Sequence, residues 1–126
     1  MRLLPAALLD VVCVLAFVLI GRSSHEEGNA LLGIVDTAWP FALGLAVGWL
    51  ATRAWRAPAR LVGTGLGVWV VTVAGGLLLR VATGDGAPVS FAVVTSLFLG
   101  ATLLGWRAAA LLIERRARRA PTAGPR

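Results

Sequence analysis

Four long apolar stretches separated by short polar connections dominate the pattern of this chain. They cover about residues 3–20, 30–51, 61–80 and 89–113. A helix needs about 20 residues to cross a hydrocarbon core of about 30 Å, and the length of each stretch is close to this value. Because lipid offers the backbone no hydrogen-bond partners, such runs are stable as helices. The pattern predicts an all-α polytopic membrane protein whose four transmembrane helices form a compact bundle over residues 1–114.

Two polar or helix-breaking residues affect where these helices begin. Asp10 interrupts the first stretch, and no small-x-small cleavage site follows it, so we interpret this stretch as a helix and not as a signal peptide. Pro40 lies inside the second stretch and should kink the helix or mark its first turns. A start at Asp36 or Thr37 would leave about 15 residues, which is short for a span. We therefore expect the longer helix from Ala30.

Composition supports the membrane class and excludes several others. With 58% hydrophobic and 14% charged residues, the 126-residue chain carries more apolar surface than a soluble domain of this size can bury. The net charge of +6 comes from arginines beside apolar runs, which orient helices and do not indicate a nucleic-acid partner. One cysteine and one histidine predict neither an internal disulfide nor a metal or other cofactor. The Pro- and Gly-containing residues 115–126 should form a basic, disordered cytoplasmic tail.

The arginines also predict the orientation of the bundle. With both termini inside, nine arginines would be cytoplasmic: Arg2, Arg53, Arg56, Arg60, Arg115, Arg116, Arg118, Arg119 and Arg126. Only Arg22 and Arg80 would lie outside. This bias predicts a multi-pass plasma-membrane protein with cytoplasmic N- and C-termini. Trp55 and Trp106 should then lie near the inner interface and Trp39 near the outer one.

The second and fourth stretches share a faint internal repeat. At an offset of 57 residues, Phe41 matches Phe98, Gly48 matches Gly105 and Trp49 matches Trp106. Two repeated helical hairpins would explain this spacing, and so would chance similarity between apolar helices.

Small residues indicate where helices approach each other. Gly44 and Gly48 have Gly-x-x-x-Gly spacing in the second stretch, and Thr37 and Ala51 extend the same stripe. A corresponding stripe in the third stretch consists of Gly65, Thr72 and Gly76. These stripes predict close packing inside the bundle or, alternatively, the seam of a homodimer.

The charged residues within the apolar stretches are the first candidates for a site. Asp10 and Arg107 should both lie about 10 Å from the inner surface, at 1.5 Å of rise per residue. A structural ion pair between them is one interpretation, because an unpaired charge in lipid is unfavourable. Arg107 could instead extend to the headgroups. In a third interpretation Asp10 is a carboxylate that couples transport to protons or cations, and Arg107 adjusts its protonation.

A second group of polar residues should gather at the outer face. It comprises Arg22, His25, Glu26, Asp36 and Arg80. Charges solvated by lipid headgroups would explain the group. An alternative is a small anion or headgroup site built on Arg22 and Arg80, with Asp36 orienting one of them.

Several of these residues together resemble a known family. They are Asp10, the Gly-Arg-Ser-Ser-His turn at 21–25, the Thr37-Ala38-Trp39-Pro40-Phe41 segment, Gly48-Trp49, Trp69 with Thr72, Arg80 and Gly105-Trp106-Arg107. Over about residues 5–110 the chain resembles the small bacterial and archaeal membrane proteins filed as domain of unknown function three-zero-five-four. The resemblance implies four helices and an actinobacterial-type plasma membrane, and it implies no particular activity.

The sequence favours a non-catalytic role. No nucleophile and base are recognisably paired, so we do not expect an enzyme. We expect a partner-binding, assembly or envelope component that contacts the bilayer and a membrane protein partner or a second copy of itself. The alternative is a small proton- or ion-coupled transporter or channel that uses Asp10, acting as an oligomer like the small multidrug transporters. The strong charge bias fits those transporters poorly, since several insert in both orientations.

Overall fold

The protein consists of four membrane-spanning helices joined by short connections. The computed structural model describes residues 3–23 and 30–119. The elements in chain order are α1 (Leu3–Ser23), α2 (Ala30–Thr52), η1 (Ala54–Arg56), η2 (Leu61–Gly65), α3 (Leu66–Ala82), α4 (Val89–Leu99), η3 (Gly100–Leu104) and α5 (Gly105–Arg119). The third span joins η2 to α3, and the fourth joins α4, η3 and α5. All four spans are long and apolar enough to cross a membrane, as the hydrophobic pattern predicted.

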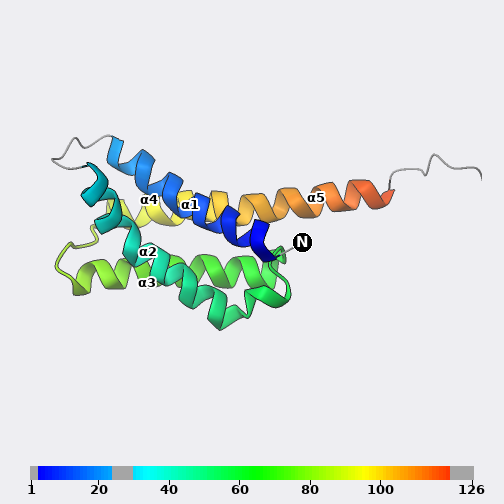
Figure 1. The fold of residues 1–126 in the computed structure, drawn as a ribbon, viewed down its shortest axis with the longest axis horizontal. Coiled ribbons are helices and arrows are strands. Elements are labelled where there is room, and N and C mark those ends of the chain that lie inside the picture. Colours follow the sequence, from blue (N-terminus) through cyan, green and yellow to red (C-terminus); the bar gives the residue numbers. More distant parts are fainter. Residues whose placement is uncertain (1–2, 24–29, 120–126) are drawn as a thin grey trace, which may run out of the picture.

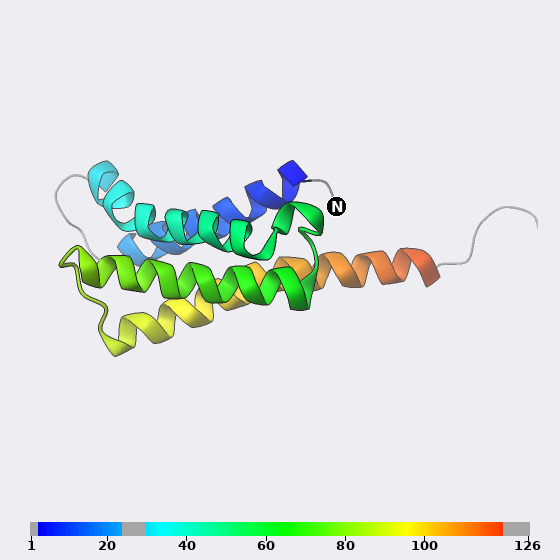
Figure 2. The same ribbon diagram turned by 90° about the horizontal axis from the view of Figure 1, so that it is seen from below.

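The spans form a bundle with one distinct, arginine-rich end. Figures 1 and 2 show α2 beside α3, and Figure 1 shows α1 crossing the fourth span. In both views the start of α1 and the connection between α2 and the third span lie at the same end. We call this the basic end, because that connection carries Arg53, Arg56 and Arg60. From here α5 extends past the ends of the other helices.

The contact between α2 and α3 depends on glycine. A Cβ atom on Gly44 would lie 2.8 Å from the backbone oxygen of Thr72, and one on Gly48 would lie 3.3 Å from the Cα of Val68. Two helix backbones can come this close only where side chains are missing. The predicted stripe therefore packs inside the bundle, although its last member, Ala51, is exposed.

Aromatic rings fill the middle of the bundle around α1. The ring centroid of Phe17 lies 5.4 Å from that of Phe41, 5.7 Å from that of Phe98 and 6.1 Å from that of Phe91. These separations lie in the range at which aromatic pairs stabilise each other beyond simple burial. Phe17 therefore links α1 to α2 and to the fourth span at once.

One of two uncertain helix boundaries agrees with the sequence prediction, and the other differs from it. Residue Pro40 lies inside α2, so the longer of the two predicted helices forms, and Figure 2 shows its first turns bending away from the rest. The fourth span continues to Arg119, whereas the sequence pattern placed its end at residue 113. Residues 115–119 of the predicted disordered tail are thus helical, and 120–126 lie outside the described residues. Arginine favours helices, and Arg118 pairs with Glu114 one turn earlier at 2.5 Å.

The third and fourth spans each contain one π-helical segment that the periodicity did not predict. The third span begins with η2, and the fourth is interrupted by η3. Such segments leave backbone groups displaced from regular α-helical bonding. In η3 the hydroxyl of Thr102 donates to the carbonyl oxygen of Phe98 at 2.9 Å. A side chain thus supplies a hydrogen bond to one of the backbone oxygens at this interruption.

Replacing Gly44 by alanine should destabilise the bundle. The new Cβ would meet backbone atoms of α3, which cannot move aside as a flexible side chain could. We expect the free energy of unfolding in detergent to fall by about 1–3 kcal/mol. Gly105→Ala is the matched control, because a Cβ there has no atom within 4 Å. Equal thermal stability of the two variants, measured by circular dichroism, would contradict this account of the α2–α3 contact.

Candidate functional site

The polar centre of the protein is a two-pronged ion pair between the first and fourth spans. Arg107 donates from Nη2 to Oδ2 of Asp10 at 2.7 Å and from Nη1 to Oδ1 at 2.8 Å. Two parallel N–H to oxygen bonds are the strongest arrangement open to a guanidinium and a carboxylate. Both side chains are 0% exposed. The structure thus contains the Asp10–Arg107 pair that the sequence suggested as one interpretation, and Arg107 does not extend to the headgroups.

Two tryptophans complete the shell around Asp10. The indole N–H of Trp106 donates to Oδ1 and that of Trp49 donates to Oδ2, each at 2.8 Å. Each carboxylate oxygen therefore accepts one bond from the guanidinium and one from an indole. Trp49 comes from α2 and Trp106 from α5, so one aspartate binds side chains from two other spans. We call Asp10, Trp49, Trp106 and Arg107 the polar clamp.

Arg107 also holds backbone on the side away from Asp10. Its Nε donates to the carbonyl oxygen of Pro58 at 2.9 Å, and its Nη1 donates to that of Leu103 at 3.0 Å. Pro58 lies in the connection between the second and third spans. A Cβ on Gly65 would lie 3.0 Å from the Cδ of Arg107, so the start of the third span packs on the arginine stem. The polar clamp therefore contacts all four spans.

This arrangement explains how charged groups are tolerated in an apolar bundle. An isolated charge within a bilayer costs about 2.5–3.5 kcal/mol by insertion scales. Here the carboxylate accepts four hydrogen bonds and the guanidinium donates four. Ala6, one turn before Asp10 on the same helix, is fully buried. Its small side chain leaves room for the first span to pack closely on its neighbours beside the ion pair. The shell is closed, which makes the polar clamp suited to holding helices together.

The local chemistry offers little to a metal ion. Among residues 3–23 and 30–119, no group of three His, Cys, Asp or Glu side chains is placed to hold one. Cys13 lies one turn after Asp10 and is a buried free thiol. Among the side chains that the structure describes, ion pairs join Asp10 with Arg107 and Glu114 with Arg118.

Of the outer cluster that the sequence suggested, the structure describes only the side chains of Asp36 and Arg80, and it does not bring these two together. The Arg80 Nε donates to the carbonyl oxygen of Gly86 at 3.1 Å, and its guanidinium lies 4.5 Å from the ring centroid of Phe91. Arg80 thus binds its own turn, and no ion pair joins it to Asp36 within the described part of the chain. His25, Glu26 and the side chain of Arg22 lie outside the described residues.

The remaining candidates lie along the first half of α2. Asp36 is exposed and lines a shallow hollow with Gly33, Val35 and Trp39. Trp39 is 38% exposed. Thr37 is half-buried and Pro40 is buried. These residues do not converge on one point as the polar clamp does.

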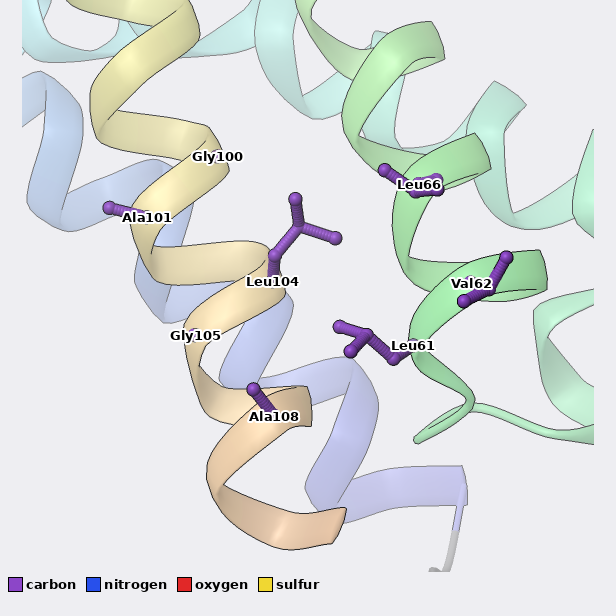
Figure 3. Close-up of a pocket in the computed structure, with 8 residues that line it drawn as sticks. All are labelled: Leu61, Val62, Leu66, Gly100, Ala101, Leu104, Gly105 and Ala108. Carbon is purple, nitrogen blue, oxygen red and sulfur yellow. The ribbon is translucent and has the colours of Figure 1, made fainter. Parts of the chain in front are cut away.

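An apolar groove lies between the start of the third span and the middle of the fourth span. Figure 3 shows its lining, which consists of Leu61, Val62, Leu66, Gly100, Ala101, Leu104, Gly105 and Ala108. Its volume is about 450 Å³. A groove with this lining offers no polar side chain to a substrate and suits a hydrocarbon chain.

Only part of the polar clamp could be predicted from the sequence. Depth along the helices brought Asp10 and Arg107 together, but Trp106 was predicted to lie at the inner interface as an anchoring ring. Trp49 is marked in the sequence by the repeat, in which it matches Trp106, and by the family resemblance. The repeat is the signal that relates Trp49 to the site, because it places both indoles at the same level of the bundle. The Pro58 carbonyl had no signal, since any backbone oxygen could have taken its place.

The fold and the polar clamp define the class of protein: a polytopic membrane bundle whose buried charges are neutralised internally. The chain belongs to the family described as "Protein of unknown function (DUF3054)", which matches residues 7–110. This match includes all four residues of the polar clamp and confirms the resemblance seen in the sequence. Neither the comparison with curated proteins nor that with solved structures gave a match.

Breaking the buried pair should be far more damaging than breaking an exposed one. Asp10→Asn or Arg107→Gln leaves the partner charge buried and unpaired, so we expect a loss of about 3–5 kcal/mol in unfolding free energy. The double variant should lose less than the sum of the two. Glu114→Gln with Arg118→Gln is the control, because that pair is exposed and should contribute at most about 1 kcal/mol.

Chemical or thermal unfolding in detergent measures all of these variants. Strictly additive losses at positions 10 and 107 would contradict a direct pair. Exchanging the two residues should not restore stability, because the indoles of Trp49 and Trp106 can only donate and would then face a guanidinium.

Proposed function

We propose that this protein is a non-catalytic integral membrane component that binds a partner or supports assembly or maintenance of the envelope. The observation that carries the proposal is the closed shell of the polar clamp. Its charged groups bond to one another and to backbone oxygens. These bonds join the four spans and use the charges for that purpose. A structural role needs no more than this.

The same observation makes proton or ion coupling by Asp10 the weaker alternative. A coupling carboxylate must meet water and exchange its proton during each cycle. Here Asp10 has no solvent exposure and accepts bonds from three different side chains. Opening that shell would separate α1 from α2 and from the fourth span, at a large cost in bonding.

The projecting end of α5 supports a role in binding. Its last turns extend beyond the other helices in both ribbon views. Leu112 and Ile113 are exposed there, and four arginines follow them within the next six residues. A helix with both apolar and cationic surface beyond the bundle is available to a membrane protein partner or a second copy of the chain.

We further propose that the protein lies in the plasma membrane with both termini in the cytoplasm. The charge bias supports this orientation, since nine arginines would lie inside and two outside. The arrangement of spans agrees with it, because the start of α1, the connection with Arg53, Arg56 and Arg60, and the projecting α5 share the basic end.

Reconstitution into lipid vesicles tests the choice between a structural and a coupling role. Vesicles loaded with a pH-sensitive dye and given a proton gradient should leak at the rate of protein-free vesicles, with wild-type protein and with Asp36→Asn alike. Proton flux above that rate that disappears in Asp10→Asn would reverse the proposal. Cross-linking in cells followed by purification should in turn recover a specific membrane protein or a dimer.

Cysteine labelling tests the orientation. In a Cys13→Ala background, Asp85→Cys places a thiol in the exposed turn between the third and fourth spans, and Arg116→Cys places one near the end of α5. A membrane-impermeant maleimide added to intact cells should label the first and not the second. The reverse pattern would place the basic end outside.

A further inference from the structure

We propose that the connection at the basic end binds the phosphate group of an anionic phospholipid. A pocket of about 400 Å³ lies in this connection. It is lined by Thr52, Arg53, Arg56, Ala57, Arg60 and Thr64. Three of these lining residues are arginines, whose planar, forked guanidinium donors match phosphate oxygens. This site is separate from the polar clamp and does not depend on whether Asp10 couples to protons.

No described acidic side chain forms an ion pair with these three arginines. The sequence contains no Asp or Glu between Asp36 and Asp85, and the buried Asp10 is bonded to Arg107. Three clustered positive charges therefore repel one another until an external anion binds among them.

The connection is held in place before any ligand arrives. The Thr64 hydroxyl donates to the carbonyl oxygen of Ala57 at 2.8 Å, and Arg107 holds the carbonyl oxygen of Pro58 at 2.9 Å. Ala54, three residues before Ala57, is fully buried. A rigid backbone lowers the entropy lost on binding, so the arginines are presented in a preorganised arrangement.

Arg53 adds a sign of functional constraint. It has φ 53° and ψ 49°, and among the described non-glycine residues it alone has a positive φ. Residues with side chains are disfavoured in this left-handed region, where glycine is the usual choice. An arginine in this unfavourable conformation is consistent with a requirement for its side chain in the pocket.

The surroundings favour a lipid phosphate over a free one. Leu61 follows Arg60 directly in the chain and begins the lining of the apolar groove in Figure 3. Arginine donors and a hydrocarbon surface therefore stand on successive residues at the end of a span. A phospholipid presents its phosphate and acyl chains in the same order across a membrane interface.

Native mass spectrometry of the full-length protein tests this site. The protein is purified in detergent with equal amounts of phosphatidylglycerol and phosphatidylcholine, and the lipid that stays bound is measured. We expect wild-type protein to retain phosphatidylglycerol preferentially. A triple variant should weaken this retention on the order of tenfold or more. It combines Arg53→Gln, Arg56→Gln and Arg60→Gln.

The matched control removes the same charge from the projecting helix, with Arg115→Gln, Arg116→Gln and Arg118→Gln combined. This control should retain phosphatidylglycerol like the wild type. Equal loss in both triple variants would show general electrostatic attraction and would overturn the site. Loss of the bound lipid on adding millimolar inorganic phosphate would overturn the lipid headgroup as ligand and assign the pocket to a free anion.

The variant Arg53→Gly separates lipid binding from folding, because it removes the arginine side chain without straining the backbone. Glycine accepts the left-handed conformation freely, so this variant should be at least as resistant to thermal unfolding as the wild type. It should nevertheless bind phosphatidylglycerol more weakly, because one of the three donors is gone. Unchanged lipid retention in a stable Arg53→Gly protein would remove Arg53 from the site and contradict the proposal.

Discussion

The neutralisation of one buried carboxylate organises this bundle. Asp10 is enclosed at 0% exposure, and its two oxygens accept four hydrogen bonds from Arg107, Trp49 and Trp106. In lipid the alternative to these bonds is an uncompensated charge, so the helices that supply the donors cannot separate cheaply. Arg107 extends the same constraint to the connection between the second and third spans through the carbonyl of Pro58. The position of every span at the basic end therefore depends on this aspartate.

The rest of the bundle is held by a different kind of interaction. Towards the middle of the membrane the phenylalanine rings around Phe17 fill the interior, and α2 meets α3 through glycines that bring the two backbones together. Packing of this type gains from close van der Waals contact, because lipid tails remove the hydrophobic drive between helices. Directional bonds at the basic end select one arrangement of the spans, and close packing stabilises it along their length.

The internal repeat gains meaning from these contacts. Trp49 and Trp106 are related by 57 residues, and each donates to one oxygen of the same carboxylate. Phe41 and Phe98 have the same offset and both pack on Phe17, at 5.4 Å and 5.7 Å. The second and fourth spans thus present matching residues to α1 from two sides. Shared contacts of this kind favour repeated hairpins over chance similarity.

The sequence by itself determined the number of spans, their approximate limits and the shared depth of Asp10 and Arg107, since length, hydropathy and rise per residue are local properties. It also identified Gly44 and Gly48 as packing residues, because their spacing puts them on one helix face. Tertiary structure decided the roles of Trp49, Trp106 and the Pro58 carbonyl, the retention of Arg80 by its own turn, and the concavity that gathers Arg53, Arg56 and Arg60. These features depend on how helices rotate and approach one another, and a hydropathy pattern carries no such information. The helical continuation to Arg119 escaped prediction for another reason: charged residues after a span are compatible with helix or coil, and Figure 1 shows the helix extending beyond the bundle.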